Sequence, residues 1–492
     1  MTVVPAGRRT SARNFLLVGA ALAAFIFASH LTFLKVPFYW DELGQFVPAA
    51  LDIFQKGAWV PRSTVPNVHP PGVMAYLAAV WSITGYSIAI TRLAMLGLAA
   101  AGAVVTLRLG TCMGLSVGAA TLGAGFLSVS PLFFSQSMMA QLDMPAMVFL
   151  ALALLLFLEE RIVAAALVST VLVMMKETGI IAPFLFGMWL WFEKRRREAM
   201  WFVVPVLPLV AWLMVLDRAT GRLFGNAAFT EYNVWYLLHP VRLPLALMRR
   251  LYYLFIGTGH WIGSIAVVLA LRQSLLFRTR AWRIAGLLVV GHVLLVSVLG
   301  GAVLERYLLP VLPILYVAFA AALWRYAKPW RIASAAALGT ALIAGNFLNP
   351  PYPFPLENNL AFVDFARLHG EAAAYLETHY PDGTIATMFP LASALRRPEY
   401  GYVRHRLHVR EIDDFSSRNV APLAREDVAA LVLYSTAWDP MGLMENPEWT
   451  AFIQRYYGYE APVSPEEIRV LLGAHRVARW TRHGQWIEIY QR

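Results

Sequence analysis

The sequence predicts an α-helical protein that crosses a membrane many times and carries a small α/β domain at its C-terminal end. Of its 492 residues, 59% are hydrophobic and only 14% are charged. Soluble proteins average about 45–50% apolar and about 25% charged residues. The mean hydropathy of +0.56 points the same way. This composition excludes a purely soluble enzyme and a disordered or fibrous chain.

Residues 1–349 contain eleven apolar stretches that we expect to cross the bilayer. A span needs about 20 mostly apolar residues, and a helix satisfies its own backbone hydrogen bonds in lipid. The predicted spans are 15–35, 88–109, 116–134, 143–158, 162–175, 178–192, 200–216, 251–271, 283–300, 307–324 and 330–347. The first is too long for a signal peptide and is followed by no typical cleavage site, so we interpret it as a retained span.

The distribution of Lys and Arg predicts that the N-terminus is cytoplasmic and the C-terminus extracytoplasmic, because cytoplasmic loops are rich in these residues. The basic residues that this orientation places inside are Arg8, Arg9, Arg13, Arg108, Arg161, Lys194, Arg195, Arg196, Arg197, Arg272, Arg278, Arg280, Arg283, Arg325, Lys328 and Arg331. The alternation requires a turn at 175–178 that divides 162–192 into two short helices. Much of the net charge of +11 is then a signal of topology, and nucleic-acid binding is disfavoured.

The long segments are predicted on the outer side of a bacterial cytoplasmic (inner) membrane. The first outer loop, 36–87, contains an amphipathic surface helix at 44–57 and a half-length apolar stretch at 73–84. The soluble domain, 350–492, begins in a proline-rich stretch that ends the last span. Within it, periodicity predicts a helix at 361–380, strands at 384–387 and 429–434, and a hairpin at 475–490.

Charged residues recur where the predicted helices meet the outer surface. Asp41 and Glu42 follow the first span, and an acidic pair at a membrane exit is costly to bury and usually functional. Asp143 starts the fourth span two residues before Pro145, where it equally suits a helix cap.

Two further stretches place a cationic residue at the predicted outer ends of helices. Lys176 lies at the tip of the short hairpin, where it can meet a lipid phosphate or pair with Glu177. Arg306 starts the tenth span, where its planar fork suits phosphate oxygens but also suits an interfacial anchor. The single cysteine, Cys112, excludes an internal disulfide and a cysteine-based metal cluster.

Taken together, these motifs resemble the GT-C glycosyltransferases that use polyprenyl-phosphate sugars, in particular the protein O-mannosyltransferase and lipid A aminoarabinose transferase superfamily. The resemblance covers most of 15–347. Its landmarks are Asp41-Glu42, His69-Pro70-Pro71, Asp143-x-Pro145, Lys176-Glu177 and Arg306-Tyr307-x-x-Pro310. Relatives often have Lys where this chain has His69. The tail resembles, less specifically, the periplasmic C-terminal domains of some bacterial members.

The resemblance implies an inverting glycosyltransferase whose active site lies on the outer face. The donor is a polyprenyl-phosphate-linked sugar, and the acceptor is a hydroxyl of a protein, of lipid A or another lipid, or of a glycan. The resemblance implies that Asp41 is the general base, and that Glu42 and Asp143 orient hydroxyl groups or, together with Asp41, bind a divalent ion. The residues implied for binding the donor phosphate are Lys176, Arg306, His69 and Arg92. Those implied for binding the sugar or the acceptor are Tyr39, Trp40, Glu305 and Tyr307.

Two other classes of function stay open on the sequence. An O-antigen ligase or polymerase also acts on lipid-linked glycans at the outer face, but relies on a large outer loop with Arg and His. A secondary transporter would fit eleven spans, yet the chain has no repeated halves, and its charges lie at helix ends instead of mid-span. No His and Asp cluster has the spacing of a dedicated metal site, so metal dependence is left open.

Overall fold

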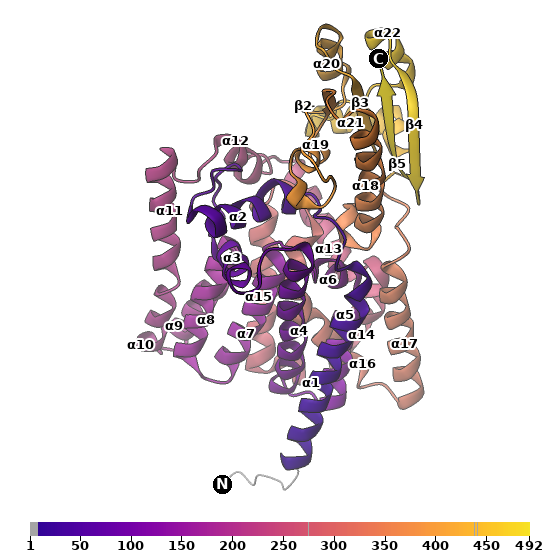
Figure 1. Cartoon of the computed structure of the whole chain (residues 1–492). Coiled ribbons are helices and arrows are strands. Elements are labelled where there is room, and N and C mark those ends of the chain that lie inside the picture. The colour runs from indigo at the N-terminus through magenta and orange to yellow at the C-terminus, as the bar shows by residue number, and fades with distance from the viewer. Residues whose placement is uncertain (1–7, 274, 437, 440) are drawn as a thin grey trace, which may run out of the picture.

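The computed structural model describes residues 8–273, 275–436, 438–439 and 441–492, the first five of them without their side chains. A block of helices makes up the larger part, with the start of α1 at one end (Figure 1). A smaller α/β part, the C-terminal region (361–492), stands on the opposite end of the block (Figure 1).

Every predicted span coincides with helical structure. The helices of the block are α1 (Arg8–His30), α4 (Ile88–Cys112), α5 (Val117–Val129), α6 (Pro131–Gln136), α7 (Asp143–Leu158), α8 (Ile162–Met175), α9 (Ile181–Phe192), α10 (Arg196–Ala199), α11 (Val206–Thr220), α12 (Ala227–Thr230), α13 (Arg242–Phe255), α14 (His260–Gln273), α15 (Arg280–Val298), α16 (Leu312–Leu323) and α17 (Lys328–Gly345). Five helical segments of the described residues are long and apolar enough to cross a membrane, or six with the bent pair α13 and α14. The remaining apolar helices are shorter, so length alone does not establish the count of eleven spans.

Two of the predicted spans differ in detail from the observed helices. The span expected at 251–271 is a bent pair, because the chain turns by 43° between α13 and α14. Thr258 and Gly259 have φ angles of +53° and +81° there, which no α-helix accommodates. The span expected at 116–134 ends at Val129, and Pro131 then starts the separate helix α6.

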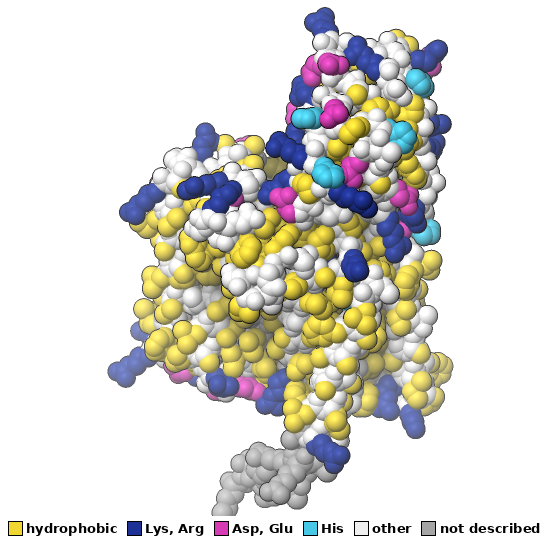
Figure 2. Space-filling model, viewed as in Figure 1, with side chains coloured by type: hydrophobic (Ala, Val, Ile, Leu, Met, Phe, Trp, Pro, Cys, Tyr) yellow, Lys and Arg dark blue, Asp and Glu magenta, His cyan; other side chains and the backbone are white. Residues whose placement is uncertain are grey.

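The predicted division of 162–192 into two short helices is confirmed. Lys176 has an extended backbone (φ −155°, ψ 127°) between α8 and the 3₁₀ helix η3 (Glu177–Ile180). On the face seen in Figure 2, hydrophobic side chains form a broad exposed band across the helical block. A lipid bilayer would cover such a band, whereas water would make it unfavourable.

The first long loop forms the predicted short helices at the end of the block nearest the C-terminal region. They are the π-helix η2 (Glu42–Phe46), α2 (Val47–Lys56) and α3 (Gly72–Thr84). Helices α2 and α3 pack against each other. Gly57, in the left-handed conformation with φ +63°, ends α2.

The C-terminal region is built on one five-stranded sheet with the order β2-β1-β3-β5-β4. Its elements are α18 (Ala361–His379), β1 (Ile385–Thr387), α19 (Leu391–Arg396), β2 (Val409–Glu411), α20 (Ser417–Val420), β3 (Ala430–Tyr434), α21 (Pro447–Tyr457), α22 (Pro465–Leu472), β4 (His475–Arg482) and β5 (Gln485–Gln491). Strand β1 is parallel to β2 and β3, while β5 is antiparallel to β3 and β4. The predicted helix, two strands and hairpin are all present, whereas β2 was not expected.

A continuous hydrophobic core joins the helical block to the C-terminal region. The Tyr402 hydroxyl donates to the Phe38 carbonyl at 2.7 Å, and the Tyr86 hydroxyl donates to the Glu399 carbonyl at 2.6 Å. The two parts are therefore packed as one body, and the C-terminal region covers the end of the block at which the first loop lies.

Candidate active site

A cavity of about 1180 Å³ lies between the helical block and the C-terminal region. Eight of the eleven predicted site residues line it: Tyr39, Trp40, Asp41, His69, Asp143, Lys176, Arg306 and Tyr307. They come from the first loop, α7, the break after α8, and the 3₁₀ helix η8 (Glu305–Val311). Residues that are far apart in the sequence are thus collected around one space.

Arg306 lies at the centre of a buried ionic cluster. Its Nη2 donates to Asp41 Oδ2, and its Nη1 donates to Glu357 Oε2 at 2.9 Å. Nη1 also donates to Gln141 Oε1 at 2.8 Å, and Nε lies 3.3 Å from Asp143 Oδ2. With only 4% of its side chain exposed, Arg306 holds three carboxylates around one cavity wall.

Lys176 joins the same cluster through Asp143. The break between α8 and η3 brings its Nζ to 2.5 Å from Asp143 Oδ1. The same Nζ lies 4.2 Å from the centre of the Tyr307 ring, a cation–π contact. Asp143 therefore bridges Lys176 and Arg306, and both cations line the cavity next to each other.

His69 reaches the cavity because the first loop packs closely on the end of α8. A Cβ added to Gly72 would collide with the Met174 carbonyl, so only glycine allows this approach. His69 Nδ1 lies 2.8 Å from Glu177 Oε2, and both side chains are largely buried. The histidine is thereby the partner of Glu177, one residue from Lys176.

Glu42 and Arg92 do not line the cavity. Both side chains are fully buried, with Arg92 Nη1 2.5 Å from Glu42 Oε1. Glu42 also accepts from the backbone N–H groups of Tyr39 at 2.8 Å and Ala140 at 2.6 Å. The pair ties the segment before η2 to α4 and to the loop before α7, and so fixes the place of Asp41.

Glu305 also lies outside this cavity and lines a second one. Its Oε1 accepts from Arg249 Nε at 2.5 Å, and its Oε2 accepts from Asn358 Nδ2 at 2.9 Å. Neighbouring residues Glu305 and Arg306 thus belong to two different spaces.

Glu357 lines the cavity although the sequence interpretation did not include it. It lies in the 3₁₀ helix η9 (Leu356–Asn358), after the proline-rich stretch that joins α17 to the C-terminal region. Burial raises the pKa of Glu357 to about 7; nearby Asp41 adds to the rise, and Arg306 opposes it. No local pattern distinguishes this residue from the other acids of the tail, since its contact with Arg306 exists only in the folded chain.

The carboxylates suggested for a divalent ion do not fit a metal site in this structure. Asp41 forms an ion pair with Arg306, Asp143 forms ion pairs with both Lys176 and Arg306, and Glu42 forms one with Arg92. Among the described residues, no group of three or more His, Cys, Asp and Glu side chains could hold a metal ion. The cations that neutralise these carboxylates belong to the protein itself.

Comparisons with known proteins place this geometry in a known fold. No protein-family model matches the chain, and no curated protein sequence matches it. The crystal structure of ArnT from Cupriavidus metallidurans bound to undecaprenyl phosphate is similar over 97% of this chain and 98% of its own, with 14% identity and a TM-score of 0.56. The same protein in the apo state gives a TM-score of 0.57.

A second similar structure is the archaeal oligosaccharyltransferase AglB from Archaeoglobus fulgidus, in complex with an inhibitory peptide and a dolichol-phosphate. It matches over 96% of this chain and 74% of its own, with 10% identity and a TM-score of 0.51. At these identities the similarity concerns the fold. The chain shares the fold of ArnT and AglB, as expected from the resemblance of its motifs to the GT-C glycosyltransferases.

Proposed function

We propose that this protein is an integral membrane glycosyltransferase that moves a sugar from a polyprenyl-phosphate donor to an acceptor hydroxyl. The fold supports the proposal, since ArnT was solved with undecaprenyl phosphate and AglB with a dolichol-phosphate. The observation that carries it is the cluster in which one cavity presents a carboxylate, Asp41, beside two cations, Lys176 and Arg306.

The reaction needs each of these groups. The acceptor oxygen attacks the anomeric carbon while Asp41 takes its proton, the bond from that carbon to the phosphate oxygen breaks, and polyprenyl phosphate leaves. Negative charge grows on the departing phosphate, and Lys176 and Arg306 stabilise it. Because the donor phosphate competes with the carboxylates for Arg306, its arrival frees Asp41 to act as the base. A single displacement of this kind inverts the anomeric carbon.

The remaining residues of the cavity have supporting roles in this proposal. Asp143 holds Lys176 and Arg306 at one wall. Tyr39, Trp40 and Tyr307 offer aromatic surfaces to the sugar or acceptor. Glu42 and Arg92, which lie behind the cavity wall, are assigned to positioning Asp41 instead of touching the substrate.

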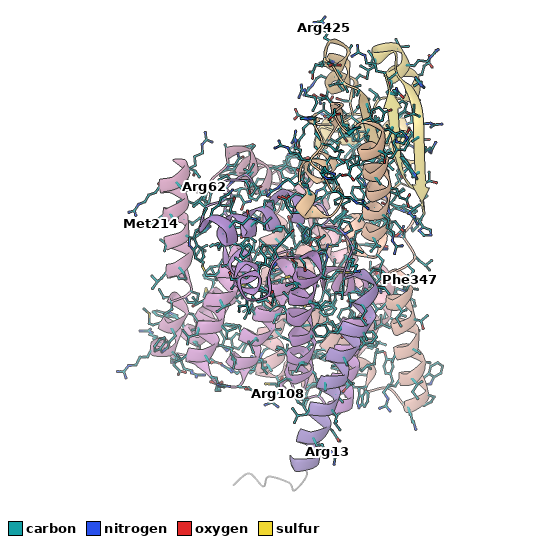
Figure 3. All side chains as sticks on the ribbon, in the orientation of Figure 1. Arg13, Arg62, Arg108, Met214, Phe347 and Arg425 are labelled. Atoms are coloured by element: carbon teal, nitrogen blue, oxygen red, sulfur yellow. The ribbon has the colours of Figure 1, made fainter. Side chains whose placement is uncertain are left out.

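The proposal places the cavity on the extracytoplasmic face of the membrane. Arg13 and Arg108 lie at the opposite end of the helical block (Figure 3), where the short loops are basic. Reporter enzymes fused after residue 348 should therefore read as extracytoplasmic, and fusions after residue 160 as cytoplasmic. The reverse result would separate the cavity from an outer-face donor.

Replacing the base gives the direct test of the function. We expect Asp41→Asn to reduce sugar transfer by about 10²–10⁴-fold, because the amide cannot accept the proton. Binding of undecaprenyl phosphate, measured on the purified protein, should be retained or become tighter, because the change removes a carboxylate that competes for Arg306. Asp382→Asn, a change at an exposed turn of the C-terminal region, is the matched control. Near-normal turnover of the Asp41 variant would exclude this residue as the base.

A further inference from the structure

The segment 396–410 of the C-terminal region is strongly basic. It contains five arginines and two histidines but only one acid, Glu399. It includes the end of α19, the 3₁₀ helix η10 (Pro398–Tyr400) and the first part of β2. The five arginines, which are together called the basic face, are Arg396, Arg397, Arg404, Arg406 and Arg410. The proposed reaction gives no role to any of them.

The fold turns these arginines to the surface. The chain between η10 and β2 packs on α19, where the Leu407 N–H donates to the Leu395 carbonyl at 3.0 Å. Arg396 Nη2 donates to the Val409 carbonyl at 3.1 Å and so joins α19 to β2. The buried apolar side chains of the segment are Tyr400, Tyr402, Val403 and Leu407. Figure 2 shows Lys, Arg and His side chains along this flank of the C-terminal region, where Figure 1 labels α19 and β2.

The positive charge of the basic face is only partly neutralised. Three of the arginines have acidic partners, in the pairs Arg396–Glu411, Arg397–Glu399 and Arg410–Glu426. Arg404 and Arg406 are exposed and form no ion pair with any other described residue. The three pairs are partly exposed, and because such pairs are weak, an external anion can compete for their arginines.

One end of the basic face opens into the cavity of the candidate active site. Arg396 and Arg397 line this cavity together with Asp41. Phe389, shortly before α19, has its ring centre 5.7 Å from that of Trp40, the neighbour of Asp41. An anionic molecule on these arginines therefore lies in the same space as Asp41.

The other end of the basic face lies farther from the helical block. The backbone N–H of Arg404 donates to Glu377 Oε1 at 2.6 Å, near the end of α18. Phe365, near the start of α18, has its ring centre 6.1 Å from that of Trp40. At a helical rise of 1.5 Å per residue, the chain from 365 to 377 spans about 18 Å. The basic face thus extends well beyond the cavity and suits a long anionic molecule.

The lack of apolar side chains on the basic face favours a polar partner. Among the described residues of the C-terminal region, the exposed large hydrophobic side chains are Met441, Trp449 and Val470, all outside 396–410. Protein partners usually bury aromatic or aliphatic anchors, and membrane-surface segments insert apolar side chains. A guanidinium group instead binds the planar carboxylate of an acidic sugar. A charged glycan chain therefore fits this face better than a protein or a lipid surface does.

We propose that the basic face binds an acidic polysaccharide, a glycan chain with carboxylates along its length, and directs one end of it into the cavity. Arg404, Arg406 and Arg410 hold the outer sugars, while Arg396 and Arg397 hold those that enter the cavity. The end of the bound chain is then a sugar acceptor, because its hydroxyl lies in the same cavity as Asp41. This acceptor role rests on the proposed function, whereas the docking rests on the basic face alone.

Oligogalacturonate, a linear glycan with one carboxylate on each sugar, is the probe for docking. Its binding to the full-length protein in nanodiscs should weaken roughly three- to tenfold in the double variant Arg404→Gln/Arg406→Gln, as for the loss of two exposed ion pairs. The matched control, Arg469→Gln/Arg479→Gln, removes two exposed arginines from α22 and from β4, the edge strand opposite β2. It should leave this binding within twofold, and both double variants should bind undecaprenyl phosphate as the parent protein does.

Two results would overturn the docking. Polyglutamate of the same charge should bind several-fold more weakly than oligogalacturonate, because a flexible chain loses more conformational freedom on binding. Equal or tighter binding of polyglutamate would indicate an acidic protein as the partner. Equal losses of oligogalacturonate binding in the two double variants would show that the attraction is nonspecific.

Transfer assays separate the docking from the proposed function. With a panel of undecaprenyl-phosphate-linked hexoses and pentoses as donors, Arg404→Gln/Arg406→Gln should raise the KM for oligogalacturonate by the same factor as its binding weakens, with unchanged kcat. Transfer to another acceptor but not to bound oligogalacturonate would refute the acceptor role alone. Intact docking without transfer to any acceptor would refute the proposed function and, with it, the acceptor role.

Discussion

The two ends of the helical block use the same kinds of ion pair in opposite surroundings. At the end with short loops, 53% of the Arg108 side chain and 23% of its partner Glu159 are exposed, and the paired side chains of Arg280 and Glu193 are 29% and 31% exposed. At the cavity end, the Arg306 and Asp143 side chains are only 4% and 3% exposed. Exposed pairs of this kind contribute about 0–1 kcal/mol, whereas breaking a buried pair costs about 3–5 kcal/mol.

This difference shows at which end of the helical block the charged residues affect stability and function. At the short-loop end, water screens each pair, so these pairs contribute little to stability. At the cavity end, each charge is kept in place by its partners and becomes strongly unfavourable when a partner is lost. Buried, mutually paired charges beside a cavity are the arrangement expected of a functional site, since their burial is otherwise costly.

The largest contrast between the ends should appear in Arg92→Met. This change leaves Glu42 buried without its partner, and we expect the free energy of unfolding to fall by about 3–5 kcal/mol. Arg108→Met at the short-loop end should lower it by about 1 kcal/mol at most. Thermal unfolding of the purified variants measures both. Adding Glu42→Gln to Arg92→Met should recover part of the loss, and a simple sum of the single effects would contradict the pairing.

A smaller effect is expected from Lys176→Ala, which removes one of the two cavity cations. The KM for the polyprenyl-phosphate donor should rise on the order of 10–100-fold, as for a lost hydrogen bond to a charged group. The KM for the acceptor should change less than twofold. Lys194→Ala, at the short-loop end, is the control. Equal losses for donor and acceptor would show that the Lys176 contacts are structural.

The smallest effect should be a pH dependence set by Glu357, whose pKa is raised to about 7. Below pH 7 this carboxyl is protonated, and Arg306 and Lys176 balance Asp41 and Asp143. Above pH 7 its charge makes the cluster net negative and repels the anionic donor. The KM for the donor should therefore rise roughly three- to tenfold as the pH rises through 7.

Glu357→Gln should flatten this dependence and retain the low KM at high pH. Other charged or ionisable side chains also line the cavity, namely His69, Arg396 and Arg397. The pH dependence of the donor KM is therefore compared between the variant and the parent protein. An unchanged slope in the variant would assign the titration to another group.

Much of the helical block can be predicted from the sequence because its signals are local. Runs of apolar residues identify the helices, and the break at Lys176 follows from the need to keep the basic loops on one side. The bend at 256–259 was missed, although Gly257 and Gly259 permit it, because both flanking stretches are apolar or amphipathic. Strand β2 has only three residues and is defined by its pairing with β1, so the sequence has no alternation of polar and apolar residues that predicts it.

The candidate site was only partly predictable. The motif positions led to eight residues that line the cavity, because helix ends at one membrane surface lie near one another. Glu357 was missed since its role depends on the path of the chain after α17. Glu305 was assigned to the same site as Arg306, yet the geometry of η8 turns the two side chains into different cavities.

The sequence by itself determined that the chain has apolar helices at these positions, an asymmetric distribution of basic residues and a more polar tail with helices and strands. Only the tertiary structure decided which of the adjacent acids Asp41 and Glu42 faces the cavity. The chain turns through a left-handed residue, Trp40 (φ +43°), and enters the π-helix that begins at Glu42. Composition and periodicity report how far a segment is from water, but the direction of one side chain follows from backbone angles and from partners such as Arg92 and Arg306.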